Sequence, residues 1–174
     1  MTITAPPVDL HVLSAEALRA LLRGDLEGAS TLVGAPVPAF FAEEGWLWGV
    51  RLAQIEADPA AARWYVRAAV TRAGNVVVGH AGFHGPPDAG GMVEIGYTVA
   101  PELRGRGHGH AIVAALLDAA ASEPSVRVVR ASISPTNARS LALVARAGFE
   151  RAGEQWDEED GLEWIFERPV DDRT

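Results

Sequence analysis

The chain has 174 residues, of which 15 are basic and 23 acidic, giving a formal net charge of -8. It contains no cysteine, and all fifteen basic residues are arginine, so lysine is absent as well. These absences exclude disulfides, thiolate metal sites, an acyl-cysteine intermediate, a Walker A phosphate loop and a lysine Schiff base. The length and the 48% hydrophobic content fit one globular domain spanning residues 1–174.

The negative charge is concentrated near the carboxyl end of the chain. Residues 1–149 carry 13 acids and 12 arginines, whereas residues 150–174 carry 10 acids and 3 arginines. The acidic segment is interpreted either as a solvated turn and polar tail or as a rim that attracts a cationic acceptor. An acidic chain does not favour nucleic acid as a partner. No apolar run reaches membrane-spanning length and Met1–Val8 has no basic leader, so we expect a cytoplasmic protein without a membrane partner.

The amino-terminal third is predicted to hold one strand and two helices. Asp9–Leu13 is a strand candidate, and Ser14 is a helix N-cap followed by an apolar face that ends at Gly24. Residues 32–38, rich in glycine and proline, indicate a loop. Residues 40–56 have a helical pattern.

Strands dominate the middle of the chain. Trp64–Thr71 and Val76–Phe83 flank the sequence Ala73-Gly74-Asn75, which is typical of a short hairpin turn. A loop over residues 85–91 leads to a third strand, Met92–Val99.

The last third alternates helices and strands. Residues 111–121 and 137–147 are predicted helices, and residues 126–133 are a predicted strand between them. Residues 149–156 and 162–168 form a predicted hairpin around the acidic turn. The order of elements predicts a single α/β or α+β domain with its core at about residues 9–168 and a short flexible tail after it.

The most informative segment lies directly after the third central strand. Arg104-Gly105-Arg106-Gly107-His108-Gly109-His110 places three alternating glycines and two arginines before a helix. Glycines let backbone N–H groups approach an anion, and a helix N-terminus adds unpaired N–H groups and the positive end of its dipole. The sequence therefore predicts a pyrophosphate site. A Rossmann dinucleotide site is rejected because the spacing is G-x-G-x-G and Arg127 stands where the acidic residue belongs.

This segment resembles the signature of the GNAT acetyltransferases, Arg/Gln-x-x-Gly-x-Gly/Ala. A second stretch, Asn137–Phe149, resembles the family's Asn-x-x-Ser/Ala helix that ends in Gly-Phe. The resemblance covers about residues 64–168 and implies one mixed, mostly antiparallel sheet of about six or seven strands. It further implies that the sheet is splayed at the cofactor site and flanked by about four helices. The strand Glu94-Ile95-Gly96-Tyr97 looks most like the branch that includes ribosomal-protein N-terminal acetyltransferases.

The resemblance implies acetyl-CoA as the donor, with no metal, and a small-molecule amine or a peptide N-terminus as the acceptor. The backbone of residues 97–99 would pair with the pantetheine arm, and the N–H near Val99 would polarise the thioester carbonyl. The expected cofactor-binding residues are Tyr97, Thr98, Val99, Arg104, Gly105, Arg106, Gly107, His108, Gly109, His110 and Asn137. We expect a monomer or a homodimer.

Acid–base chemistry must remove the proton of the amine and protonate the leaving thiolate. Glu94 is the candidate base, with His80 and His84 as weaker candidates. The family's usual acid, a tyrosine seven residues after the asparagine, is replaced by Val144, so Ser140 is the candidate acid.

The acceptor groove is expected between residues 40–48 and the last hairpin, with Trp46, Trp48 and Trp156 as possible lining. Without cysteine, transfer is expected to be direct within a ternary complex. Two alternatives stay open: a non-catalytic acyl-CoA-binding sensor domain, which Val144 permits, and transfer of a bulkier acyl group.

Overall fold

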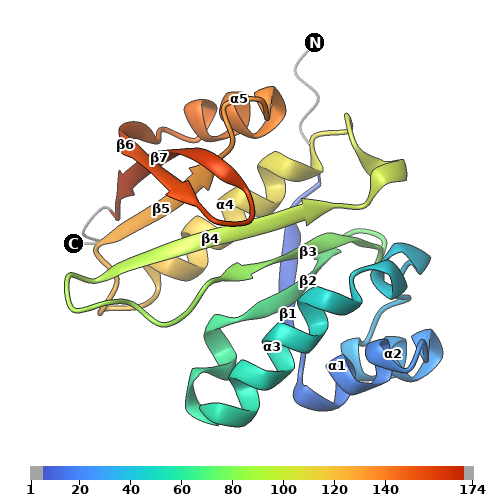
Figure 1. Cartoon of the computed structure of the whole chain (residues 1–174). Helices are drawn as coiled ribbons and strands as arrows, with labels where there is room; N and C mark the ends of the chain where they lie inside the picture. Colours follow the sequence, from blue (N-terminus) through green and yellow to red (C-terminus); the bar gives the residue numbers. More distant parts are fainter. Residues whose placement is uncertain (1–5, 171–174) are drawn as a thin grey trace.

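A single mixed sheet of seven strands forms the centre of the molecule in the computed structural model, which describes residues 6–170 (Figure 1). The strands follow the order β1-β2-β3-β4-β5-β7-β6, and only β4 and β5 run parallel. The strands are β1 (Val8–Val12), β2 (Val66–Thr71), β3 (Val77–Phe83), β4 (Met92–Val99), β5 (Val128–Ile133), β6 (Glu150–Asp157) and β7 (Gly161–Pro169). This architecture confirms the expected fold class.

Helices cover both faces of the sheet. The α-helices are α1 (Ala15–Leu22), α2 (Leu26–Val33), α3 (Gly45–Ala57), α4 (His108–Ala121) and α5 (Ala138–Arg146), and the short 3-10 segments are η1 (Ala39–Glu43), η2 (Pro59–Trp64) and η3 (Pro101–Leu103). Helix α4 packs against β1, β3 and β4, whereas α1 packs against α2 and α3. In Figure 1 the helices α1, α2 and α3 form one group, well away from α5.

The amino-terminal helices differ from the sequence prediction. Helix α2 was not predicted; it is capped by Asp25, whose Oδ1 accepts a hydrogen bond from Gly28 N at 2.8 Å, and it ends at Gly34 with a φ of 79°. The predicted loop over residues 32–38 therefore starts two residues too early. The predicted helix over residues 40–56 is broken at Glu44 into η1 and α3, because the indole of Trp48 donates a hydrogen bond to the Phe41 carbonyl at 2.5 Å.

Two further element boundaries differ from the sequence prediction. Strand β2 begins at Val66 rather than Trp64, because Pro59 starts a 3-10 turn that runs to Trp64. Helix α4 begins at His108, three residues earlier than predicted, directly after Gly107 in the left-handed conformation. The glycine-rich turn is thus shorter than its sequence indicated.

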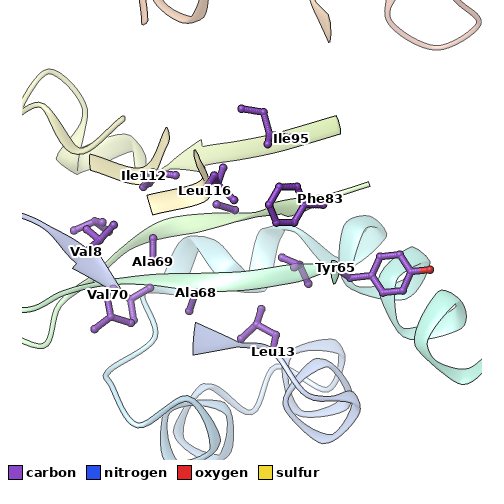
Figure 2. Close-up of a cluster of buried hydrophobic side chains, with 14 of the residues drawn as sticks. Val8, Leu13, Tyr65, Ala68, Ala69, Val70, Phe83, Ile95, Ile112 and Leu116 are labelled. Carbon is purple, nitrogen blue, oxygen red and sulfur yellow. The ribbon is translucent and has the colours of Figure 1, made fainter. Parts of the chain in front are cut away.

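The hydrophobic core lies between α4 and the sheet and continues to the opposite face. Ile112 and Leu116 of α4 lie over the sheet near Phe83 and Ile95 (Figure 2). Leu13 lies on the other side of the strands, and all five side chains are buried. Burying side chains of this size stabilises the fold by about 1.5–3 kcal/mol each. This core holds β3 and β4 in place against α4.

Strands β4 and β5 separate soon after they meet. Their parallel pairing covers only Met92, Val93 and Glu94 of β4. Beyond Glu94 the strand β4 pairs with β3 alone, whereas β5 continues beside β7. The expected splay is therefore present, and it leaves one edge of β4 open from Ile95 to Val99.

The carboxyl end is tied to the sheet as far as the structure describes it. Val170 N donates a hydrogen bond to the Arg127 carbonyl at 2.8 Å. The predicted flexible tail falls mainly on residues 171–174, which lie outside the described residues. No helix within residues 6–170 has the length and apolar character needed to cross a membrane.

Candidate active site

The open edge of β4 presents unpaired backbone groups. His84 N donates to the Glu94 carbonyl at 2.8 Å, and Ala100 N donates to the Val78 carbonyl at 2.9 Å. In an antiparallel ladder, hydrogen-bonded residues alternate. The backbone groups of Ile95, Tyr97 and Val99 therefore point away from β3, toward the gap beside β5. An extended ligand can form strand-like hydrogen bonds there.

The glycine-rich turn leads from this edge to the N-terminus of α4. Gly105 and Gly107 adopt φ values of 75° and 85°, a region that other residues rarely enter. Gly109 has a different role, because it lies within α4. A Cβ on Gly109 would lie 2.5 Å from Leu143 Cδ1 of α5, so this glycine permits close approach of the two helices. The first turn of α4 directs unpaired N–H groups outward.

A groove of about 1820 Å³ lies along the open edge of β4, the turn, α4 and α5, and it extends to residues 7–10, Arg67 and Arg72. This volume exceeds the range of a pocket for one drug-sized molecule and suits a long ligand. Of the residues predicted from sequence to bind cofactor or to catalyse, those that line it are Tyr97, Thr98, Val99, Arg104, Gly105, Gly107, His108, Gly109, His110, Asn137 and Ser140. Arg106 and Glu94 do not line it.

Arginines supply the positive charge of the groove. Arg104 donates from Nε to the Val99 carbonyl at 3.2 Å, so it also supports the end of β4. Arg139 and Arg146 of α5 line the groove and form no ion pair with any residue in the described part of the chain. Sequence reasoning missed both, although their spacing of seven on an amphipathic helix places them on one face.

His108 is buried at the start of α4, and its Nδ1 has no hydrogen-bond partner among the described residues. Its pKa is lowered, mainly by burial and further by the charge of Arg106. A neutral imidazole here leaves the positive charge of the groove to the arginines and the helix terminus.

Three polar groups meet where the groove reaches the gap. Asn137 Oδ1 accepts a hydrogen bond from Ser140 N at 3.1 Å and so caps α5. The hydroxyl of Tyr97 is buried and has no hydrogen-bond partner within residues 6–170. Burial raises the pKa of Tyr97, and the neighbouring Ser140 hydroxyl lowers it in part. Val144 is fully buried and does not line the groove.

The opposite face of β4 carries the candidate base. Side chains alternate along a strand, so Glu94 points away from the face of Ile95 and Tyr97. Glu94 Oε1 lies 3.8 Å from His84 Nδ1. The pKa of His84 is lowered by burial and by Arg51, which outweigh the raising effects of Glu94 and Glu163. The side chain of Glu94 is 21% exposed, so its carboxylate is partly accessible to solvent.

His80 belongs to the core rather than to a reaction site. Its ring packs against Phe40, Phe41 and Trp48, with centroids 5.1–5.9 Å apart. The pKa of His80 falls to about 4 because burial, and to a lesser degree Arg51, disfavour its charged form. Its Nε2 lies 3.4 Å from Glu44 Oε2. Sequence reasoning named Trp48 as possible acceptor lining; this is wrong, because Trp48 is fully buried.

The acidic hairpin and the other two candidate tryptophans are exposed. Trp46 is 70% exposed on α3 and Trp156 is 76% exposed on β6. Asp157 Oδ1 accepts hydrogen bonds from Glu159 N and Asp160 N at 2.8 and 2.9 Å, which lowers its pKa and forms the turn. Part of the acidic run thus has a structural role. No group of three or more acidic or histidine side chains within the described residues is placed to hold a metal ion.

Comparisons with known proteins agree with this geometry. A family model described as an acetyltransferase (GNAT) domain matches residues 15–150. No curated protein shows significant sequence similarity to the chain.

Several solved structures share the fold. Ribosomal-protein-S5-alanine acetyltransferase from Vibrio fischeri is 17% identical with a TM-score of 0.65, over 96% of this chain and 95% of that chain. An aminoglycoside acetyltransferase in complex with coenzyme A is 20% identical with a TM-score of 0.60, over 93% and 94%. A phosphinothricin acetyltransferase from Sinorhizobium meliloti in complex with AcCoA is 22% identical with a TM-score of 0.59, over 96% and 90%. At these identities the similarity establishes the fold alone.

Proposed function

Because the chain belongs to the GNAT acetyltransferase family, we propose that it moves an acetyl group from acetyl-CoA directly to a primary amine. The observation that carries the proposal is the splay of β4 from β5 after Glu94. It opens a passage between a long cationic groove on one face of the sheet and a carboxylate on the other. Donor and acceptor can therefore reach the same gap from opposite sides.

The residues of the groove fit acetyl-CoA in charge and shape. The left-handed glycines and the first turn of α4 offer N–H groups to a pyrophosphate, and Arg104, Arg139 and Arg146 add charge for phosphates. The outward-facing backbone groups of Tyr97 and Val99 match the amides of a pantetheine arm. When bound, the cofactor supplies an activated acetyl thioester. Arg106 is expected to act on phosphates only at the outer rim, because it does not line the groove.

On the acceptor side, Glu94 takes the proton of the attacking ammonium group, directly or through a water molecule. The N–H of Val99 faces the gap and polarises the carbonyl that is attacked. Ser140 lies on α5, on the side of the gap from which the thiolate departs, where a proton must be supplied. With no cysteine in the chain, the two substrates are bound together when the acetyl group moves.

The acceptor is a small cationic amine or a peptide N-terminus. Solved relatives are named as acetyltransferases of an S5 alanine, an aminoglycoside and spermidine, all of which carry amino groups. Glu94, Glu163 and the exposed hairpin acids favour a positively charged molecule on this face. A cytoplasmic location is part of the proposal, since acetyl-CoA is the donor.

The test is an acceptor screen with acetyl-CoA that follows release of free thiol. The panel contains polyamines, aminoglycosides, amino acids and short peptides with free N-termini, each paired with its N-acetylated form. We expect thiol release with at least one free amine and none with its acetylated partner. If CoA binds at micromolar concentration while no amine in the panel is acetylated, the sensor-domain alternative replaces this proposal. Release with butyryl-CoA but not with acetyl-CoA would instead indicate a bulkier acyl group.

A further inference from the structure

The Tyr97 hydroxyl is a buried polar group that lines the groove. No described residue forms a hydrogen bond with it at ordinary bonding distance, although the Ser140 hydroxyl lies near it. A buried hydroxyl without a partner costs about 1–3 kcal/mol, so such groups are rare unless a ligand satisfies them. The observation indicates a polar ligand atom at this point of the groove.

The position of Tyr97 relates this hydroxyl to the gap between the strands. Tyr97 pairs with Ala81 of β3 and lies three residues beyond the last β4–β5 pair, so it stands beside the gap. It shares the α4 face of β4 with Ile95, opposite to Glu94. In the proposed function a thioester would reach the gap from the groove, on the face where Tyr97 lies, and the amine would approach from the other face.

Helix α5 does not provide an acid at the position where the sequence motif places one. Val144 is fully buried and lies away from the groove. Ser140, one turn earlier, lies close enough to Tyr97 for its hydroxyl to act on the phenol. A serine hydroxyl is by itself a poor acid, but it can donate a hydrogen bond to a phenolate.

We propose that Tyr97 is the residue that protonates the CoA sulfur, and that Ser140 acts through it. The inference rests on the proposed function and deepens it by assigning the acid. As the carbon–sulfur bond breaks, its electron pair moves to sulfur and takes the proton of Tyr97 Oη–H, so an S–H bond forms and a phenolate remains. Ser140 Oγ–H stabilises the phenolate, which regains a proton from solvent after CoA leaves. The phenol is protonated at neutral pH, and the Ser140 hydroxyl offsets part of the raise that burial causes in the pKa of Tyr97.

The chain offers a matched control, because it has only two tyrosines, Tyr65 and Tyr97. The experiment compares Tyr97→Phe and Tyr65→Phe with two donors, acetyl-CoA and its selenium analogue, whose selenol leaving group is more acidic and needs no acid. We expect Tyr97→Phe to lower single-turnover acetyl transfer from acetyl-CoA by about 100-fold. With the selenium analogue the loss is expected to be under about threefold, and CoA affinity, measured by calorimetry, is unchanged. Tyr65→Phe is expected to match wild type with both donors.

Equal losses of Tyr97→Phe with both donors would overturn the proposal, as would no loss with acetyl-CoA. In that case the wild-type enzyme still acetylates its amine, so the failure is separate from that of the proposed function. A second readout is independent of activity. In the Tyr65→Phe background, Tyr97 is the only tyrosine, and Ser140→Ala is expected to shift its ultraviolet tyrosinate titration to higher pH. An unmoved titration would overturn the role of Ser140.

Discussion

Glu94 and Tyr97 lie three residues apart on one strand and therefore point to opposite faces of the sheet. This separation allows a base and an acid to act on the two ends of one reaction without neutralising each other. Glu94 has its ion-pair contact with His84 at 3.8 Å, too long for a hydrogen bond. Its carboxylate therefore retains free lone pairs for an incoming ammonium group.

Substitution of Glu94 tests the base. Glu94→Gln keeps the shape of the side chain but cannot accept a proton, so we expect kcat/KM for the best amine to fall by about 10²–10⁴-fold. Acetyl-CoA affinity is expected to stay at the wild-type value, because Glu94 does not line the groove. Glu27→Gln, an exposed change on α2, is the control. Acetyl transfer at the wild-type rate in Glu94→Gln would refute this role.

His80 gives the fold a pH dependence whose sign can be stated. The pKa of His80 is about 4 in the folded protein, below the ordinary 6.5. Between these two pH values the unfolded chain therefore binds a proton at His80 that the folded protein does not bind. The free energy of unfolding should therefore decrease as the pH falls from about 6.5 to 4, with a contribution of about 3 kcal/mol from this residue. Urea unfolding at several pH values measures it. In His80→Phe this part of the slope should vanish, and an unchanged slope would contradict the assignment.

At the scale of elements, the glycine-rich turn and the N-terminus of α4 form one unit with α5. The three alternating glycines do not share one purpose. Gly105 and Gly107 supply the left-handed turn, whereas Gly109 lets α5 pack closely. Residues of α4 and α5 form part of the groove lining, which also includes the end of β4, the turn and residues 7–10.

A double-mutant cycle tests whether Gly109 acts through its contact with Leu143, with Gly105 as the comparison. Gly109→Ala is expected to change the free energy of unfolding by less than about 1 kcal/mol, because alanine favours the helix by about 1 kcal/mol while its Cβ, at 2.5 Å, displaces only the Cδ1 end of Leu143. Leu143→Ala removes the side chain that must shift, so Gly109→Ala should be more favourable in that background, with a coupling of up to about 1 kcal/mol. Gly105→Ala is the control: nothing lies within 4 Å of its Cβ, so its cost of about 1 kcal/mol comes from the positive φ. Leu143→Ala should not relieve that strain, and additive effects of Gly109→Ala and Leu143→Ala would disprove the contact.

At the scale of the whole molecule, charge is distributed unevenly. Arg104, Arg139 and Arg146 line the groove, together with Asp9 and Asp118. Glu94 and Glu163 lie near His84, where Arg51 also acts. Glu154 and Glu167 are paired with arginines, so only part of the acidic excess faces solvent unpaired. The arginines of the groove suit an anionic donor, and Glu94 and Glu163 suit a cationic acceptor.

The kinetic mechanism expected from this arrangement is transfer within a ternary complex. Initial rates at varied concentrations of both substrates should give intersecting lines, because donor and acceptor occupy opposite faces together. Enzyme mixed with acetyl-CoA alone should release no stoichiometric burst of CoA, since no cysteine is present to hold the acetyl group. Parallel lines with such a burst would show a covalent intermediate and exclude the ternary complex.

Local chemistry in the sequence was sufficient to predict much of this molecule. The sequence predicted Met92–Val99 with its correct bounds, and it predicted both helices of the groove, although the first begins three residues earlier than expected. These signals are local: strand periodicity, a left-handed turn and a helix cap act within a few residues. Most of the residues that they named as cofactor-binding or catalytic line the groove, and the roles of these residues in binding and catalysis stay predictions.

Tertiary contacts decided the rest. The burial of Trp48 and of Val144 depends on neighbours far along the chain, which periodicity does not encode. The same holds for the buried Tyr97 hydroxyl beside Ser140, since β4 and α5 meet only in the folded protein. The sequence alone determined which chemistries are excluded and predicted where an anion would bind. The sheet, by opening between β4 and β5, decided which side chains can reach the reacting atoms.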